Sequence, residues 1–450
     1  MRNVMLVVLM VGLWLVATGC ASIAGMSVPT ETPFPTKVAR VATPSMPATT
    51  APTLPAAVTP ASTPSANTPT RGAASVRTPT LPPVPVGKVT LLPDSMPPVK
   101  PMRMQSPEYG AQAFLWWRAE TAHRDLTLMR EAGLTWVKQT FAWRDIEGAK
   151  KGTFNWENAD RAVLLANQFG IDILARVDNA PDWAAPGCFN PAKKQMGPAR
   201  NMQDWLDFLD ALVKRYKGRI RAYAIWNEPN LAREWCGRPP NPVEYAALLK
   251  ASYAKIKSID PNAIVVSAGL TPTSAYNDEA MPDEMFLSKM YDAMKNNSTG
   301  YFDALGLHAP GYKAPPEMSP DEVVKNPAYN NNEPVTGRVY CFRHVEDMRK
   351  IMVARGDANK QVVILEFGWT MDPIHKEYAW FAVDESTHGQ YIVRAFQWAK
   401  QNWSPWIGAM FVIYVANPDW TEQTEEYWWA ITKPDGTPRG AYIRIKAMPK

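Results

Sequence analysis

Two short motifs place a carboxylic acid at the end of an apolar run. Residues 222–230, AYAIWNEPN, reach Asn227 and Glu228 after such a run, and residues 362–369, VVILEFGW, reach Glu366 after another. In a barrel of parallel strands, side chains at the carboxyl ends of the strands gather at one face, so the two glutamates would face each other across one cleft. Such a pair suits glycosidic bond cleavage: one carboxyl gives a proton to the leaving oxygen, and the other attacks or shields the sugar carbon.

The separation of the two carboxyl groups decides the stereochemistry. A gap of about 5 Å makes the second carboxylate a nucleophile and retains the configuration, whereas a wider gap leaves room for water and inverts it. Glu228 has to be protonated in the free enzyme, and we expect the charge of Glu366 to raise its pKa. Once Glu366 is consumed in a glycosyl intermediate, that pKa falls and Glu228 activates water. Pro229 fixes φ and stiffens the end of the strand, while Asn227 supplies a neutral donor.

The elements that must position these residues alternate along the chain from Tyr109 onward. Short apolar runs are separated by longer amphipathic runs, the clearest of which begins at Asn241 and Pro242 and ends at Asp260. Strands without regular polar alternation, separated by helices, indicate a parallel sheet covered by helices, and eight of them indicate a closed α/β barrel of the (β/α)8 or TIM type. The predicted strands cover residues 109–114, 135–141, 171–177, 221–226, 263–268, 302–308, 361–366 and 408–414.

The two glutamate motifs, together with LGLHAPGY at residues 305–312, resemble the glycoside hydrolases of clan A, particularly families 5 and 39 and their cellulase-like relatives. The segments WRDIEGAKKGTFNWENADRAVLLANQFGIDILARV and YWWAITKPDGTPRGAY are also similar to those families, so the resemblance covers residues 105–447. It implies a retaining β-glycoside hydrolase that acts on a polysaccharide or oligosaccharide by double displacement, and the N-terminal segment described below indicates that this enzyme is extracytoplasmic. In this resemblance Glu228 is the acid/base and Glu366 is the nucleophile.

The same resemblance implies roles for further residues. Asn227 corresponds to a hydrogen-bond partner of the sugar 2-hydroxyl, and His308 and Tyr312 correspond to the floor of the −1 subsite, with Tyr312 bonded to Glu366. Many of these enzymes place arginine near the end of the second strand, where this chain has Lys138. A lysine supports the nucleophile as a point charge but lacks the bidentate geometry of a guanidinium. A glycan-binding barrel that has lost turnover is therefore the alternative, although the presence of both glutamates favours the enzyme.

Aromatic and acidic residues near strand ends supply candidate sugar contacts. The chain has 18 tryptophans, and pyranose rings stack on aromatic faces, so we expect platforms among the tryptophans that follow strands. Glu147 is a rival carboxylate, which we interpret as a loop ion-pair partner of Arg144 or a lysine. Asp178 and Asp182 either hold substrate hydroxyls or cap a turn. The segment 314–340 is the predicted specificity loop. The expected platforms are Trp183, Trp235, Trp369 and Trp420.

Cysteines and histidines give little support to metal or redox chemistry. Cys188 and Cys236 fall in loops after the third and fourth strands, at the same rim, and we expect a disulfide between them. Cys341 is expected to be a buried free thiol. The five histidines are scattered without ligand spacing, so the sequence predicts neither a metal nor a cofactor. The pattern Gly-x-Ser-x-Gly of a serine nucleophile is absent.

The N-terminal part of the chain is typical of an exported and tethered protein. Residues 1–20 resemble a lipoprotein signal, in which Cys20 is lipidated and anchors the chain to the membrane; an uncleaved anchor is the alternative. We expect residues 21–101 to form a disordered linker rich in Pro, Thr and Ala, and residues 102–450 to form the catalytic domain. The linker is basic and supplies the net charge of +5, so nucleic-acid binding is not expected. We expect a monomer on the cell surface.

Overall fold

The computed structural model describes residues 97–450 apart from Trp117. The predicted signal segment, the lipidated Cys20 and nearly all of the predicted linker lie outside the described residues and stay predictions. No helix in the described part of the chain combines the length and the apolar character needed to cross a membrane.

Eight parallel strands form a closed barrel in the order in which they occur along the chain. The first and last strands pair directly, with Tyr109 opposite Met410, and this pairing closes the ring. All eight strands agree with the predicted ones to within a few residues, so the predicted (β/α)8 barrel is confirmed. The strands are β1 (Glu108–Gln112), β2 (Trp136–Ala142), β3 (Asp172–Asp178), β4 (Ala222–Ile225), β5 (Ile264–Ser267), β6 (Ala304–Pro310), β7 (Gln361–Gly368) and β8 (Ile407–Val412).

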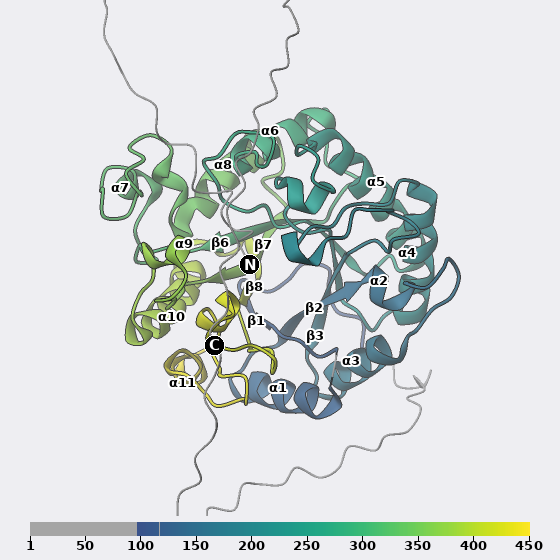
Figure 1. Ribbon diagram of the computed structural model, residues 1–450, viewed down its shortest axis with the longest axis horizontal. Helices are drawn as coiled ribbons and strands as arrows, with labels where there is room; N and C mark the ends of the chain where they lie inside the picture. The colour runs from purple at the N-terminus through teal and green to yellow at the C-terminus, as the bar shows by residue number, and fades with distance from the viewer. Residues whose placement is uncertain (1–96, 117) are drawn as a thin grey trace, which may run out of the picture. The chain divides into compact units, whose positions relative to one another are not determined.

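Helices surround the barrel, and the longer ones follow one another around it in chain order, as Figure 1 shows. The predicted start of α5 is confirmed, because the Asn241 side chain accepts hydrogen bonds from the backbone N–H groups of Val243 and Glu244, both at 3.1 Å. The helices are α1 (Ala119–Glu131), α2 (Trp143–Ile146), α3 (Glu157–Gln168), α4 (Met202–Tyr216), α5 (Pro242–Ile259), α6 (Asp283–Ala293), α7 (Pro320–Val323), α8 (Val345–Ala354), α9 (Lys376–Ala379), α10 (Glu385–Asn402) and α11 (Gly440–Ala447).

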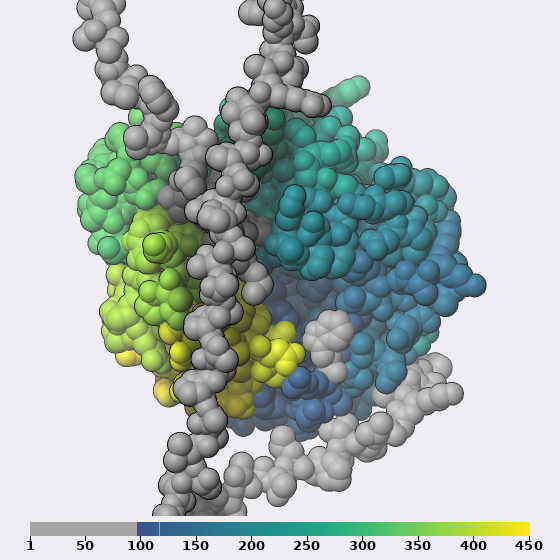
Figure 2. Space-filling model, in the orientation of Figure 1, coloured from purple at the N-terminus to yellow at the C-terminus, as the bar shows by residue number. Residues whose placement is uncertain are grey.

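The first and last parts of the domain lie beside each other, as the blue and yellow surfaces in Figure 2 show. In addition to the β1–β8 pairing, α1 and α11 are joined by an ion pair from Lys446 to Glu131, with Nζ and Oε2 2.7 Å apart. The domain is therefore closed by contacts between segments that are more than 300 residues apart in sequence.

Apolar side chains fill the barrel on both sides of the sheet. Most of the core lies between strands and helices, and a smaller cluster fills the inside of the barrel. Because side chains alternate along a strand, the position two residues beyond an inward residue also faces inward. Trp136 on β2 and Leu174 on β3 belong to the inner cluster, and the next inward positions are Lys138 and Arg176. The charged residues Lys138 and Arg176 therefore lie next to the apolar cluster inside the barrel, on the side of the carboxyl ends of the strands.

Candidate active site

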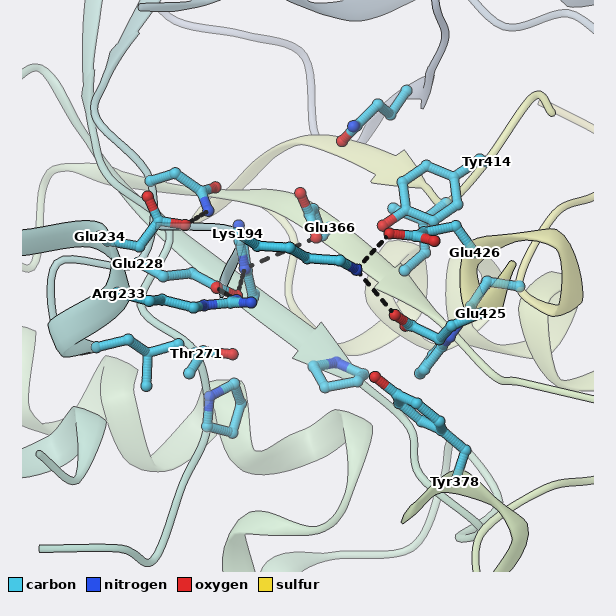
Figure 3. Close-up of a pocket in the computed structure, with 18 of the residues that line it drawn as sticks. Lys194, Glu228, Arg233, Glu234, Thr271, Glu366, Tyr378, Tyr414, Glu425 and Glu426 are labelled. Atoms are coloured by element: carbon cyan, nitrogen blue, oxygen red, sulfur yellow. Dashed lines mark hydrogen bonds and ion pairs between the residues drawn. The ribbon is translucent and has the colours of Figure 1, made fainter. Parts of the chain in front are cut away.

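A cavity of about 600 Å³ opens at the carboxyl ends of the strands. Its lining comes from residues at or after β1 and β3 to β8, and it contains both Glu228 and Glu366. Figure 3 shows the two side chains close to each other in the same cavity, although β4 and β7 are separated by β5 and β6 in the ring. The size suits a small organic ligand, since such pockets usually measure about 300–1,000 Å³.

Glu228 reaches the cavity through an irregular turn and not directly from a strand end. The strand β4 ends at Ile225, and Trp226 and Glu228 then adopt positive φ angles of 75° and 34°. Such backbone conformations are unfavourable for residues with side chains, by roughly 1–3 kcal/mol each, and they persist only where the surroundings hold them. The Glu228 N–H donates to the Gly269 carbonyl at 3.1 Å, and the buried Trp226 indole donates to the Glu234 carbonyl at 2.9 Å.

Glu366 faces inward because β7 carries an irregularity just before it. Leu365 belongs to the apolar cluster inside the barrel, so regular alternation would turn Glu366 outward. The pairing with β6 instead passes from Ile364 opposite Leu307 to Glu366 opposite His308 and omits Leu365. An extra residue in one strand changes which side chains face inward, and here it aims the carboxylate into the cavity.

His308 lies between the two glutamates. Its Nδ1 atom is 3.0 Å from Glu228 Oε1 and 3.8 Å from Glu366 Oε2. Those two oxygens cannot lie farther apart than the sum of the two distances, a limit that accommodates the separation of about 5 Å used by retaining glycosidases. The ring fits only because residue 269 is glycine, since a Cβ atom there would lie 2.2 Å from His308 Cδ2.

Two cations hold Glu366 in its ionised form. Lys138 Nζ is 2.6 Å from Glu366 Oε1, and Arg176 Nη1 is 4.0 Å from the same oxygen. Burial alone would raise the pKa of Glu366, but the nearby His308, Lys138 and Arg176 outweigh it and lower the pKa. The structure thus brings Lys138 to the predicted nucleophile. Sequence reasoning missed Arg176, although an arginine inside the apolar run ILARV was an available signal.

The charge state of Glu228 differs from the prediction. Burial alone would raise its pKa, but a contact with the Arg233 guanidinium and a hydrogen bond with His308 hold the pKa well below its usual range. The expected rise of this pKa through repulsion by Glu366 is therefore wrong, because Arg233 and His308 outweigh that repulsion. Arg233 lies five residues beyond Glu228, and nothing in the sequence indicated that the intervening turn would bring the two together.

A second buried carboxyl lies beside this pair. Burial raises the pKa of Glu234 to about 8, so this group is largely neutral near pH 7. Asn227 links it to the site: its amide donates to Glu234 Oε1 at 3.1 Å and accepts from Arg176 Nη1 at 3.3 Å. Asn227 therefore lies in the cavity wall beside Glu228, as predicted, with protein partners for both ends of its amide.

Tyr312 lies in the cavity wall but does not bond to Glu366. Its hydroxyl donates to the Pro272 carbonyl at 3.1 Å, which corrects the expected contact. Tyr414, which follows β8, also lines the cavity, and burial together with the charge of Glu366 raises its pKa far above the usual range. Figure 3 shows Tyr414 and Glu366 on the same side of the cavity. Sequence reasoning did not identify Tyr414.

Two of the expected tryptophan platforms are buried, and those predictions are wrong. Trp369 is 0% exposed and donates its indole N–H to the Ala314 carbonyl at 3.0 Å. It occupies the space above Gly311, where a Cβ atom would lie 1.9 Å from the indole. Trp235 is likewise buried and bonds to Glu244 at 2.8 Å. A sugar needs an open ring face, and neither indole offers one.

The other two tryptophans differ in position. Trp183 lies outside the cavity lining, packs edge-on against Trp143 and donates to the Glu147 carbonyl at 2.7 Å, so the structure does not support its expected role. Trp420 does line the cavity and is only partly buried. Its ring packs edge-on against Phe114 and Tyr414, with centroids 4.9 and 5.1 Å apart. Trp420 therefore stays a candidate platform.

Two predicted loop features also need correction. Residues 314–340 contribute no lining residue to the cavity and instead pack behind it, in an apolar cluster shared with the loops after β7 and β8, so the expectation of a specificity loop there is not supported. Glu147 is buried and accepts from the Trp143 indole at 2.7 Å and from the Gly152 N–H at 2.5 Å, rather than pairing with Arg144. Its role is to hold the loop after α2.

The acidic residues after β3 have protein partners. Asp178 is buried, with Oδ2 2.8 Å from Arg176 Nε, and it accepts from the Asn179 side chain at 2.7 Å. It therefore holds the guanidinium that faces Glu366, a role that neither of the two interpretations from sequence included. Asp182 is exposed and lies 3.7 Å from Arg144.

The described residues include one group with the composition of a metal site. Ligand atoms of Glu284, His344 and Asp347 lie within 4.8 Å of one another. Burial disfavours a charged imidazole, but the Asp283 carboxylate, 2.8 Å from His344 Nε2, and further acidic neighbours raise the pKa of His344 to about 10. A protonated imidazole is not a metal ligand, so these residues are better explained as an ion-pair cluster.

Cys188 and Cys236 form a disulfide, as the sequence predicts, and Cys341 is a buried free thiol. The disulfide joins the loop after β3 to the loop after β4. Its Cα atoms are 4.7 Å apart, and the two cysteines are 48 residues apart in sequence. The bond therefore attaches a long rim loop to the segment that carries Glu228 and Arg233.

The fold and the site define a (β/α)8 barrel with two converging glutamates at its carboxyl face. Residues 113–186 match the sequence model of a family described as beta-galactosidase, glycoside hydrolase family 42. No curated protein matches the chain. In fold, and over this segment in sequence, the chain is similar to glycoside hydrolases of clan A.

Solved structures extend the similarity to most of the chain. A family 39 glycoside hydrolase from Bacteroides cellulosilyticus WH2 is 18% identical with a TM-score of 0.54, and the match covers 78% of this chain and 65% of that one. A glucosidase from Croceicoccus marinus is 14% identical with a TM-score of 0.53, covering 78% and 68%. A family 39 β-xylosidase from Caulobacter crescentus is 15% identical with a TM-score of 0.53, covering 78% and 72%. At such identities the similarity establishes the shared fold.

Proposed function

We propose that this protein is a retaining β-glycoside hydrolase that cleaves a β-linked glycan, with Glu366 as nucleophile and Glu228 as acid/base. The observation that carries the proposal is the pair of carboxylates in contact with one histidine ring, of which Glu366 is held ionised by Lys138 and Arg176. An ionised carboxylate beside a group that can exchange a proton is the pair that double displacement needs.

The reaction follows from this geometry in two steps. Glu366 attacks the anomeric carbon while Glu228 gives its proton to the departing glycosidic oxygen, which leaves a glycosyl ester on Glu366. Glu228 then takes a proton from water, which attacks the anomeric carbon and frees Glu366. Because the Arg233 contact lowers the pKa of Glu228, the proposed mechanism has the bound sugar take over part of the Arg233 contact as Glu228 becomes protonated.

A glycan-binding barrel without turnover is the second candidate. The exchange of arginine for Lys138 motivates it, but Arg176 supplies a guanidinium within 4.0 Å of Glu366, so the nucleophile keeps an arginine neighbour. A binding protein gains nothing from two carboxylates held by four charged or titratable side chains in a largely buried site, because burying charges is unfavourable. This balance favours the enzyme.

The test is hydrolysis of a panel of 4-nitrophenyl β-glycosides and soluble β-glycans, with NMR detection of the first anomer formed. We expect hydrolysis with the β-anomer appearing first, before mutarotation. First appearance of the α-anomer would contradict the covalent intermediate. Binding without hydrolysis across the panel would favour the alternative function.

Replacing Arg233 by methionine is expected to move the alkaline limb of the kcat/KM profile upward by about 1–3 pH units. The Arg233 charge lowers the pKa of Glu228, so its removal raises that pKa and keeps the proton on the general acid to higher pH. The measurement is the pH dependence of kcat/KM on an aryl glycoside. Arg233→Lys keeps the charge and should move the limb less. An alkaline limb unchanged in Arg233→Met would show that Arg233 does not control Glu228 during catalysis.

We also propose that the enzyme is exported and attached to the membrane through a lipid on Cys20. The disulfide between Cys188 and Cys236 supports an oxidising compartment, since such bonds are rare in the cytosol. Incorporation of labelled palmitate into the full chain, and its loss in Cys20→Ser, is the test.

A further inference from the structure

A lysine from one rim loop reaches two glutamates from another. Lys194 lies at the tip of a short hairpin after β3, in which Asn190 pairs antiparallel with Gln195, and it adopts a left-handed backbone with φ 46°. The same hairpin is attached to the loop after β4: Met196 N–H donates to the Arg233 carbonyl at 2.8 Å, and the chain is joined there by the disulfide. The lysine is thus presented from an anchored segment.

The contact partners of Lys194 come from the loop after β8. Its Nζ atom is 2.8 Å from Glu426 Oε1 and 3.5 Å from Glu425 Oε2. Figure 3 shows the lysine side chain running across the cavity toward these carboxylates. We call this contact the Lys194 bridge. Because β3 and β8 are separated by β1 and β2 in the ring, the bridge joins loops from well-separated parts of the cavity mouth.

The two glutamates share Lys194 as a contacting cation, and the Arg233 charge also acts on Glu425. Burial and the neighbouring Glu426 raise the pKa of Glu425 to about 7, which Lys194 opposes, and Tyr378 after β7 also hydrogen-bonds to Glu425. The Glu425 and Glu426 side chains are 17% and 26% exposed, whereas that of Lys194 is 51% exposed. All four residues line the cavity. In the Lys194 bridge, the two glutamate side chains are therefore largely buried, whereas the lysine side chain is about half exposed to water.

We infer that Lys194 is a specificity-determining residue whose bridge to Glu425 and Glu426 closes one side of the cavity and restricts cleavage to the end of a glycan chain. The inference rests on the proposed glycosidase function and adds the mode of attack. A polysaccharide that continues in both directions from the scissile bond needs a groove that is open at both ends. In this protein the Lys194 bridge crosses the mouth of the cavity and obstructs such a chain. A chain end enters from the other side without breaking the bridge.

The modest strength of the bridge agrees with a role in selecting chain ends over internal segments of a glycan. An ion pair whose lysine is half exposed contributes little to stability, so the Lys194 bridge disfavours internal binding several-fold without making the loops rigid. Replacing Lys194 by methionine keeps the side-chain length and removes the charge. The two carboxylates then lose their shared cation, and the loop after β8 is free to move away from the hairpin.

The test compares Lys194→Met with wild type on a short aryl β-glycoside and on the matching soluble β-glycan. We expect wild type to release small sugars with little loss of viscosity. Lys194→Met should keep its kcat/KM on the aryl glycoside within about threefold and lower viscosity about fivefold faster per bond cleaved. Lys446→Met, which removes another exposed ion pair on the outside of the barrel, is the matched control and should behave as wild type.

The outcomes separate the inference from the proposed function. Internal cleavage by wild type, or an unchanged ratio of viscosity loss to reducing ends in Lys194→Met, overturns the role of the bridge while the glycosidase assignment stands. Absence of hydrolysis by wild type on every substrate contradicts the proposed function itself and the inference with it. Unfolding temperatures of both variants close to that of wild type establish that any change reflects access to the cavity.

Discussion

Glutamine in place of Glu366 is expected to lower kcat/KM by at least about 10⁴-fold on every substrate that the wild type hydrolyses. An amide has nearly the same shape as the carboxylate but does not attack the anomeric carbon, so no glycosyl intermediate forms. The amide oxygen still accepts a hydrogen bond from Lys138, which limits the structural change. The measurement is steady-state kinetics on an aryl glycoside, together with binding of the intact glycan to the inactive variant.

Lys138 provides an internal check on this variant. Burial lowers its pKa and the Glu366 charge raises it, so loss of that charge favours the neutral amine and avoids an unpaired buried cation. We therefore expect Glu366→Gln to fold with a modest change in unfolding temperature. Glu131→Gln, on the exposed face of α1, is the control for the chemical change alone. Retention of more than a few per cent of activity by folded Glu366→Gln would remove Glu366 from the nucleophile role.

Glutamine in place of Glu228 is expected to lower kcat/KM by about 10²–10⁴-fold, but only for substrates whose leaving group needs a proton. A 2,4-dinitrophenyl glycoside leaves without assistance, so its glycosylation step should persist and an intermediate should accumulate, because Glu228 no longer activates water. A pre-steady-state burst of dinitrophenol measures this. In Glu228→Ala, azide should restore turnover and yield a β-glycosyl azide, since a small anion needs no general base.

Glu234 offers a matched control, because it is a second buried glutamate six residues away. With its pKa raised to about 8, this carboxyl is largely neutral near pH 7, and glutamine replaces it without a change of charge. We expect a much smaller loss in Glu234→Gln than in Glu228→Gln, and no dependence on the leaving group. The opposite ranking of the two variants would transfer the acid/base role to Glu234.

The barrel was predictable because each strand carries a local signal. The run QVVILE and the run IDILARV are apolar, of strand length and bounded by helical patterns, and no tertiary information is needed to recognise them. Glu228 and Glu366 follow from the same reasoning, since residues after parallel strands gather at one face. The inward direction of the Glu366 side chain could not be predicted, because it depends on the irregularity at Leu365, for which the sequence has no signal.

The electrostatics of the site could not be predicted in the same way. The pKa of Glu228 depends on Arg233, which is brought beside it by a turn with two positive φ angles. Trp369 and Trp420 both follow strands, yet one fills the space above Gly311 and the other lines the cavity. Position after a strand indicates which end of the barrel a residue occupies, whereas its depth depends on neighbours that are distant in sequence.

If Lys194 has the inferred role, the link between Cys188 and Cys236 would make substrate choice sensitive to how the protein is produced. Cys188 lies just before the hairpin that carries Lys194, Cys236 lies in the loop after β4, and the barrel strands are closed without this bond. A preparation from a reducing host would keep its native circular dichroism and its activity on a small chromogenic sugar. The loosened hairpin would nevertheless give a less selective catalyst, and two laboratories assaying different batches would report different preferred polysaccharides for one polypeptide.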